Sequence, residues 1–257
     1  MPLYDFTRDK LETYRSSVVA PADFDSFWKT TLDEARGLAA EPKFEKRDYG
    51  FPLFDVFDVT FSGFGGHPIK GWFILPARRD EKLACVVKFI GYGGGRGFPH
   101  EHLLWPSTGR AVLVMDTRGQ GSSWSKGETA DPVGSDPAVT GFMTRGILDP
   151  ASYYYRRVFT DAVRAVETAR AHPAVDGSRI AVVGGSQGGG ISLAATGLDA
   201  GIKAAMPDVP FLCDFPRAVT FTPRDPFPEI SRYLAVHRDN VERVMETLRY
   251  FDGVLFA

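Results

Sequence analysis

Residues 179–195 decide the fold, and they read RIAVVGGSQGGGISLAA. Residues 180–183 form a short apolar run that suits a strand buried on both faces, and residues 189–195 read as the beginning of a helix. Between them lies a G-x-S-x-G pentapeptide centred on Ser186. A serine on a tight turn between a strand and a helix stands clear of the strand end, so that its hydroxyl is exposed. The stretch therefore predicts Ser186 as a nucleophile.

The glycines around Ser186 have a physical reason. Gly184 and Gly188 remove Cβ atoms that would collide where helix and strand pack closely. The helix that follows directs backbone N–H groups toward a negative charge developing beside Ser186. The alternatives are a phosphate-binding loop and a plain turn. A Walker loop requires Gly-Lys followed by Ser or Thr, and this turn contains no lysine, so its context favours the nucleophile interpretation.

A second glycine-rich segment, residues 91–97, directly follows an apolar run at residues 84–90. This is the position from which a fold with such a serine turn supplies its other oxyanion donor. We expect the backbone N–H of Tyr92 to point at the substrate oxygen. The alternative is a dinucleotide-binding fingerprint, but the glycine spacing does not match G-x-G-x-x-G opening a helix, and Pro99 interrupts. No cofactor is predicted.

Strands and helices alternate along the rest of the chain. From residue 43 the apolar residues follow a period of two, and a turn at residues 63–66 predicts an antiparallel hairpin at a sheet edge. Nearly continuous apolar runs follow, with the clearest helix at residues 153–172. This order predicts one domain over residues 1–257 with a mostly parallel, doubly wound sheet, and the serine turn makes it the α/β-hydrolase fold. The apolar runs are residues 84–90, 111–115, 179–183 and 202–206.

Three segments lie outside this alternation. Residues 1–40 read as a helical extension, and residues 117–150 as a long loop rich in Gly, Pro, Ser and Asp. Residues 211–250 hold several prolines and then a charged helical stretch. We expect residues 211–250 to form a lid over the strand ends that carry chemistry, because long insertions in compact domains are usually functional or disordered. Within the long loop, Arg118 is expected to form a buried salt bridge rather than to bind a carboxylate substrate.

The bulk composition limits the partners. A net charge of −2 gives no electrostatic reason to expect nucleic acid or an anionic membrane as partner. No stretch approaches the roughly 18 apolar residues of a membrane span, and the first residues lack the pattern of a secretory signal. The pair His100 and His102 has no clear third ligand, so no metal is predicted, and Cys85 and Cys213 fit no zinc or redox motif. We expect a soluble, cytoplasmic protein.

These motifs together resemble the acetyl xylan esterase/cephalosporin-C deacetylase family of carbohydrate esterases, over almost the whole chain. The resemblance implies hydrolysis of acetyl esters on small substrates, such as acetylated xylo-oligosaccharides and the 3′-acetyl group of cephalosporin C. It also implies a cytoplasmic, metal-free enzyme that assembles as a hexamer. The stretches that carry the resemblance are residues 91–92, 94–100, 115–122, 141–147, 153–157, 184–189 and 208–213.

By position, the resemblance also implies roles for individual residues. Ser186 attacks the acetyl carbonyl, and the backbone N–H groups of Tyr92 and Gln187 hold the oxyanion. Phe211 and Pro226 help to wall a pocket small enough to favour acetyl.

The chain departs from the family pattern after residue 254, where members continue with two strands that deliver an aspartate and then a histidine. We therefore expect those strands, with the catalytic acid and base, to be missing from this sequence. The only histidine after Ser186 is His237, and Asp208 is a conceivable acid. Three interpretations stay open: a truncated record of a longer esterase, an esterase completed by a separate segment, and an inactive assembly subunit. A serine peptidase of the same fold is the enzymatic alternative.

Overall fold

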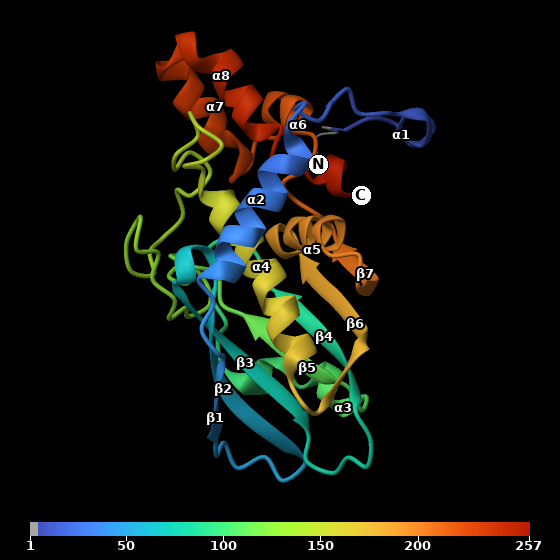
Figure 1. The fold of residues 1–257 in the computed structure, drawn as a ribbon. Helices are drawn as coiled ribbons and strands as arrows, with labels where there is room; N and C mark the ends of the chain where they lie inside the picture. Colours follow the sequence, from blue (N-terminus) through green and yellow to red (C-terminus); the bar gives the residue numbers. More distant parts are fainter. Residues whose placement is uncertain (1–4) are drawn as a thin grey trace.

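The structure is a computed structural model that describes residues 5–257, so residues 1–4 of the predicted helical extension lie outside it. In the described residues one 7-stranded sheet has the order β1-β2-β3-β5-β4-β6-β7 (Figure 1). This order and the helices around it confirm the predicted α/β-hydrolase fold. The strands are β1 (Lys43–Arg47), β2 (Phe54–Ser62), β3 (Pro68–Pro76), β4 (Leu83–Phe89), β5 (Ala111–Met115), β6 (Val175–Gly185) and β7 (Ile202–Asp208).

The sheet is mixed, and the direction of its strands changes at β5. Strands β4, β5, β6 and β7 pair in parallel, whereas β1, β2, β3 and β5 pair antiparallel. The predicted hairpin is β2–β3, but it does not lie at the edge, because β1 pairs along β2 from Lys43 to Arg47. Strand β1 reads KFEKR and is largely exposed, as suits a charged edge strand that discourages pairing with other chains.

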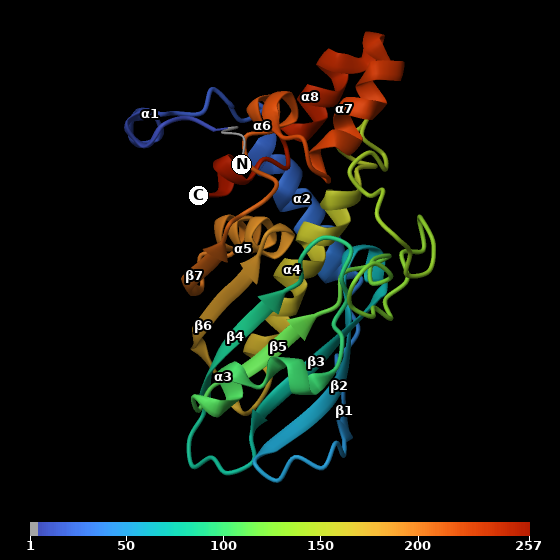
Figure 2. The same ribbon diagram turned by 180° about the vertical axis from the view of Figure 1, so that it is seen from behind.

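The helices are distributed unequally over the two faces of the sheet. Helices α2, α4 and α5 cover the face seen in Figure 1, and α3 lies on the opposite face, seen in Figure 2. The α-helices are α1 (Arg8–Thr13), α2 (Phe24–Gly37), α3 (Leu104–Ser107), α4 (Tyr154–Ala171), α5 (Gln187–Leu198), α6 (Phe215–Phe221), α7 (Phe227–Val236) and α8 (Val241–Leu248). Short 3₁₀ turns are η1 (Phe64–Gly66), η2 (Pro99–His102), η3 (Arg238–Asn240) and η4 (Gly253–Phe256).

The main core lies between the sheet and the helices α2, α4 and α5. Helix α4, the predicted helix of residues 153–172, buries one long apolar stripe against β4 and β6. The indole of Trp28 stacks on Phe159 at 6.0 Å and meets the ring of Phe251 edge-on at 5.6 Å. Since burying one large apolar side chain contributes about 1.5–3 kcal/mol, this aromatic cluster ties the N-terminal helix α2 and the C-terminal residues firmly to α4.

Residues 211–250, the predicted lid, fold into the helices α6, α7 and α8. They lie above the carboxyl ends of the parallel strands (Figure 1). Their inner surface is apolar, with Phe215, Ile230 and Val244 buried. This surface packs against the main core, so the segment is part of the folded body of the chain. In the described residues no helix is both long and apolar enough to cross a membrane.

A buried group of charges anchors the long loop of residues 117–150. The guanidinium of Arg118 donates to both carboxylate oxygens of Asp161 on α4, at 2.6 and 2.7 Å, and all these atoms are inaccessible to solvent. Asp131 of the same loop accepts from Arg157 of α4 at 2.8 Å. The expectation of a buried salt bridge at Arg118 is therefore confirmed.

Removing one member of this buried group of charges should lower the stability of the folded protein. In Asp161→Ala, the guanidinium of Arg118 loses its two short bonds and keeps a longer ion pair with Asp131 at 3.5 Å, and the N–H of Phe64 loses its acceptor. We expect the free energy of unfolding in urea to fall by about 3–5 kcal/mol. The control is Glu12→Ala, which breaks an exposed ion pair with Arg8 and should cost at most about 1 kcal/mol. Equal losses in the two variants would contradict the anchoring role of the buried pair.

Candidate active site

Ser186 sits at a strained turn between β6 and α5. Its backbone has φ 54° and ψ −118°, a conformation that non-glycine residues rarely adopt, and its side chain is exposed. The surrounding backbone holds the turn in place. The N–H of Ser186 donates to the carbonyl of Asp208 at 2.9 Å, and its carbonyl accepts from the N–H of Phe211 at 2.9 Å. The predicted strand, turn and helix are therefore present, with the hydroxyl directed away from the packed interior.

Close backbone packing explains the two glycines of the motif. A Cβ atom on Gly184 would lie 2.4 Å from the carbonyl carbon of Gly188. A Cβ atom on Gly188 would lie 2.4 Å from the carbonyl oxygen of Phe89, at the end of β4. No real side chain tolerates such distances, so only glycine at both positions allows β4, β6 and α5 to meet beneath Ser186.

Two backbone N–H groups beside the turn are free to bind an anion. Gln187 is the first residue of α5, and Tyr92 belongs to the glycine-rich loop after β4. Within the described part of the chain, neither N–H donates a hydrogen bond. The two segments lie together, because a Cβ atom on Gly91 would stand 3.7 Å from the carbonyl oxygen of Gly185. The residues predicted as oxyanion donors are thus brought to one place, and the dipole of the 12-residue helix α5 favours negative charge there.

A buried pair of amide side chains joins the two loops. Gln120 donates to the side-chain oxygen of Gln187 at 2.8 Å, and its own oxygen accepts from the N–H of Gly93 at 2.7 Å. Gln187 donates to the carbonyl of Ile90 at 3.1 Å and accepts from the hydroxyl of Tyr155 at 2.9 Å. The pair therefore fixes the loop after β4 to the start of α5 through neutral hydrogen bonds. No pattern in the sequence signals it, since Gln120 and Gln187 stand 67 residues apart.

The tyrosines at the start of α4 complete this polar layer. Tyr154 donates to the carbonyl of Arg118 at 2.5 Å and accepts from Gln120 at 3.0 Å. Burial raises the pKa of Tyr154 and that of Tyr155 far above the usual value for a phenol. Both side chains therefore remain neutral hydrogen-bond donors around neutral pH.

Aromatic rings line the space beside Ser186. The ring of Phe211 lies 4.4 Å from that of Phe227 and 6.2 Å from that of Tyr92. Phe211 also donates its N–H to Ser186, which places the ring next to the turn. Pro226 immediately precedes Phe227, the first residue of α7, and is therefore joined to this aromatic group through the chain. Of the two residues predicted to wall the pocket, Phe211 is the one that the structure sets directly beside Ser186.

An exposed indole flanks the glycine-rich loop. The side chain of Trp124 is 64% exposed, and its indole N–H donates to the carbonyl of Tyr92 at 2.8 Å. It borders a cavity of about 400 Å³ that also reaches Gly91, Gly185 and Lys88. The sequence analysis did not single out Trp124, because an isolated tryptophan in a polar loop carries no motif.

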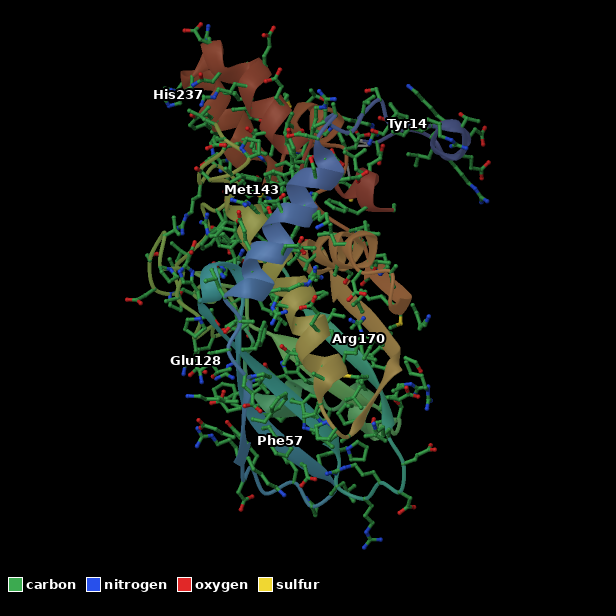
Figure 3. The ribbon with its side chains drawn as sticks, in the orientation of Figure 1. Tyr14, Phe57, Glu128, Met143, Arg170 and His237 are labelled. Carbon is green, nitrogen blue, oxygen red and sulfur yellow. The ribbon has the colours of Figure 1, made fainter. Side chains whose placement is uncertain are left out.

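None of the five histidines in the described chain hydrogen-bonds to Ser186. His237, the only histidine after Ser186, is exposed at the end of α7 (Figure 3), where its ring lies tilted against that of Tyr233, with the ring centroids 4.4 Å apart. Asp208 contacts the turn through its backbone carbonyl, and its side chain is exposed. His237 and Asp208 therefore do not complete a catalytic triad here. In the same residues no group of three His, Cys, Asp or Glu side chains is placed to hold a metal ion.

The sheet order, the turn at Ser186 and the two loops beside it define a protein of the α/β-hydrolase class. The chain belongs to the acetyl xylan esterase (AXE1) family, whose model matches residues 1–257. The family resemblance predicted from the sequence motifs is thereby confirmed.

Known proteins similar to this chain agree with that assignment. The structure of an acetyl xylan esterase from Paenibacillus sp. R4 is 39% identical, with a TM-score of 0.90 over 98% of this chain and 80% of that one. Acetyl xylan esterase 1 from Thermoanaerobacterium sp. JW/SL YS485 is 28% identical, with a TM-score of 0.89 and the same coverage. The acetyl esterase Axe7A of Xylanibacter ruminicola is 28% identical over 254 residues, which are 98% of this chain and 56% of that protein. The chain thus spans little more than half the length of this curated relative.

The amide pair should contribute measurably to stability. In Gln120→Leu, the N–H of Gly93 and the side chain of Gln187 lose partners inside the protein. An unsatisfied buried polar group costs about 1–3 kcal/mol, so we expect a loss of this size in the free energy of unfolding, measured in urea. Unchanged stability would mean that the loop after β4 is held by its other contacts alone.

His102 should make the stability depend on pH. Burial, and next the charge of Lys88, lower the pKa of His102 to about 4 from an ordinary value of 6.5. Between these values the unfolded chain binds a proton that the folded chain excludes. The contribution of the neutral imidazole is therefore complete above pH 6.5 and is lost as the pH falls toward 4, by at most about 3 kcal/mol.

The test compares the free energy of unfolding at pH 7.5 and pH 5 in wild type and His102→Gln. The variant should lose less stability on acidification than wild type does. His100→Gln, at an exposed neighbouring histidine, is the control and should behave like wild type. An identical loss in all three proteins would refute the assignment to His102.

Proposed function

We propose that this chain carries the nucleophile and oxyanion site of a serine esterase that removes acetyl groups from small acetylated carbohydrates. The observation that carries the proposal is the exposed Ser186 on its strained turn, beside two backbone N–H groups without acceptors. Membership of the acetyl xylan esterase family supports the choice of acetyl esters as substrates.

In the proposed reaction, the Oγ atom of Ser186 attacks the acetyl carbonyl carbon while its proton passes to a base. The oxyanion is held by the N–H groups of Tyr92 and Gln187, each of which is worth about 2.7–4 kcal/mol to a transition state of this kind. The ester C–O bond then breaks, the sugar oxygen takes the proton from the base and leaves as a neutral alcohol, and water hydrolyses the acetyl-serine to acetic acid, which restores the Ser186 hydroxyl. The proposal requires a base beside Ser186, and the described residues do not supply one.

The aromatic wall supports a preference for a short acyl group. Phe211 stands beside the turn, and it is braced by Phe227 of the lid. We propose that Phe211 and Pro226 together limit the pocket to acetyl. Acetylated xylo-oligosaccharides and the 3′-acetyl group of cephalosporin C are the proposed substrates, and assembly of the complete protein as a hexamer remains a prediction.

Replacing the nucleophile tests the proposal in the full-length protein. Ser186→Ala should lower kcat for p-nitrophenyl acetate by more than about 10⁴-fold, because the acyl-serine cannot form. It should also abolish labelling by a fluorophosphonate probe. The intact mass of the labelled wild type should show one phosphonyl group, and the mass of the proteolytic peptide that contains Ser186 should locate it there. Retained turnover in the variant would refute the proposal.

A matched pair of substrates separates the esterase from a peptidase of the same fold. We expect turnover of an acetyl ester and none of the amide with the same acyl group. Faster cleavage of the amide would favour the peptidase. A complete protein that is folded but neither labels nor turns over would favour an inactive assembly subunit.

A further inference from the structure

The phenol of Tyr92 joins three segments that are distant in the sequence. Its hydroxyl lies 2.9 and 2.8 Å from the two carboxylate oxygens of Glu229 on the lid helix α7, to which it donates. The same hydroxyl accepts from the backbone N–H of Phe142 at 2.7 Å. Glu229 in turn accepts from the N–H of Met143 at 3.1 Å. Figure 3 shows Met143 below the lid helices, in the long loop.

These contacts hold Tyr92 at both ends. At the backbone, the indole of Trp124 donates to its carbonyl, and the next residue, Gly93, is tied to Gln120. At the tip of the side chain, the hydroxyl is tied to Glu229 and Phe142. Of the polar groups of Tyr92, only the backbone N–H has no hydrogen-bond partner within residues 5–257. The direction of the Tyr92 N–H is therefore set by the hydrogen bonds of the neighbouring backbone and of the Tyr92 hydroxyl.

Glu229 is a partly buried carboxylate, which is an unusual acceptor for a bond with a structural role alone. The residue is half-buried, and no cation lies within ion-pair distance of it in residues 5–257. Partial burial of a carboxylate costs free energy of folding unless donors surround the carboxylate. Burial, and next the charge of Glu229, raise the pKa of Tyr92, so the phenol keeps the proton that it donates. The bond is thus a charge-assisted one, which is stronger and more directional than a neutral bond.

We propose that Glu229 is a positioning residue that acts through the hydroxyl of Tyr92 to aim the Tyr92 N–H at the oxyanion. The inference rests on the proposed function. It makes the lid part of the oxyanion site, because α7 and the loop after β4 share this bond. Loss of this bond alone would leave the pocket wall of Phe211 in place and would misdirect the donor in the transition state.

Three variants of the complete protein test this role. Glu229→Met keeps the volume and removes the acceptor, Glu229→Gln keeps one acceptor oxygen, and Tyr92→Phe removes the hydroxyl while keeping the backbone N–H. We expect kcat for an acetyl ester to fall about 10-fold in Glu229→Met and Tyr92→Phe, with KM changed less than about twofold. A misdirected donor should lose part of the transition-state stabilisation that is lost entirely when the donor is deleted. Glu229→Gln should recover part of the loss.

The double variant decides whether the two residues act together. Tyr92→Phe combined with Glu229→Met should be no slower than either alone, since both remove the same bond. Amide hydrogen exchange of residues 90–95 should accelerate in both single variants, which reports the loosened loop independently of turnover. Glu242→Gln, at an exposed glutamate of α8, is the control and should match wild type.

The outcomes separate the two proposals. Wild-type kcat and exchange in Glu229→Met, with Ser186→Ala inactive, would overturn the positioning role and leave the esterase intact. Faster exchange with unchanged kcat would also overturn it, because the bond would then order the loop without aiming the donor. Wild-type turnover in Ser186→Ala would instead remove the proposed function itself.

Discussion

The whole site depends on one steric constraint, the close approach of three backbone segments beneath Ser186. With Cβ atoms at Gly184 or Gly188, α5 could not begin where it does, and the carbonyl of Phe89 could not lie against it. Because β4 ends at this contact, the glycine-rich loop that follows is delivered beside the start of α5. The bonds from Ser186 to Asp208 and Phe211 bring in the end of β7 and the beginning of residues 211–250 at the same point.

Around this contact the protein uses neutral hydrogen bonds, and it keeps its paired charges one layer away. Gln120, Gln187 and Tyr155 fasten the loops next to Ser186. The buried pair of Arg118 and Asp161 anchors the same long loop farther from the turn. Amides and phenols place no fixed net charge beside the position where an oxyanion would form. Three charged side chains lie near the turn: Glu229, which is bonded to the phenol of Tyr92, Asp208, which lies beside Gly185, and Lys88, which borders the same cavity as Trp124.

Much of the fold could be predicted because its strands and helices follow from local patterns of apolar residues. The apolar runs gave the parallel strands, the period of two gave the hairpin, and the long apolar stripe gave α4 within one residue at each end. The predicted position of the hairpin at the sheet edge was wrong, because the edge strand β1 is short and charged and carries almost no periodic signal. The N–H of Tyr92 was predicted as an oxyanion donor from motif context and that of Gln187 from the family resemblance, and the catalytic role of both remains a proposal.

The sequence by itself determined the turn at Ser186, the loop after β4 and the family, because each depends on residues adjacent in the chain and on glycines that a turn or close contact requires. Only the tertiary structure decided what holds these pieces together. Gln120 meets Gln187 across 67 residues, and Tyr92 meets Glu229 across 137. A glutamine or glutamate in such a place looks the same in sequence as one in solvent, since its role is set by which group the folded chain brings within 3 Å of it.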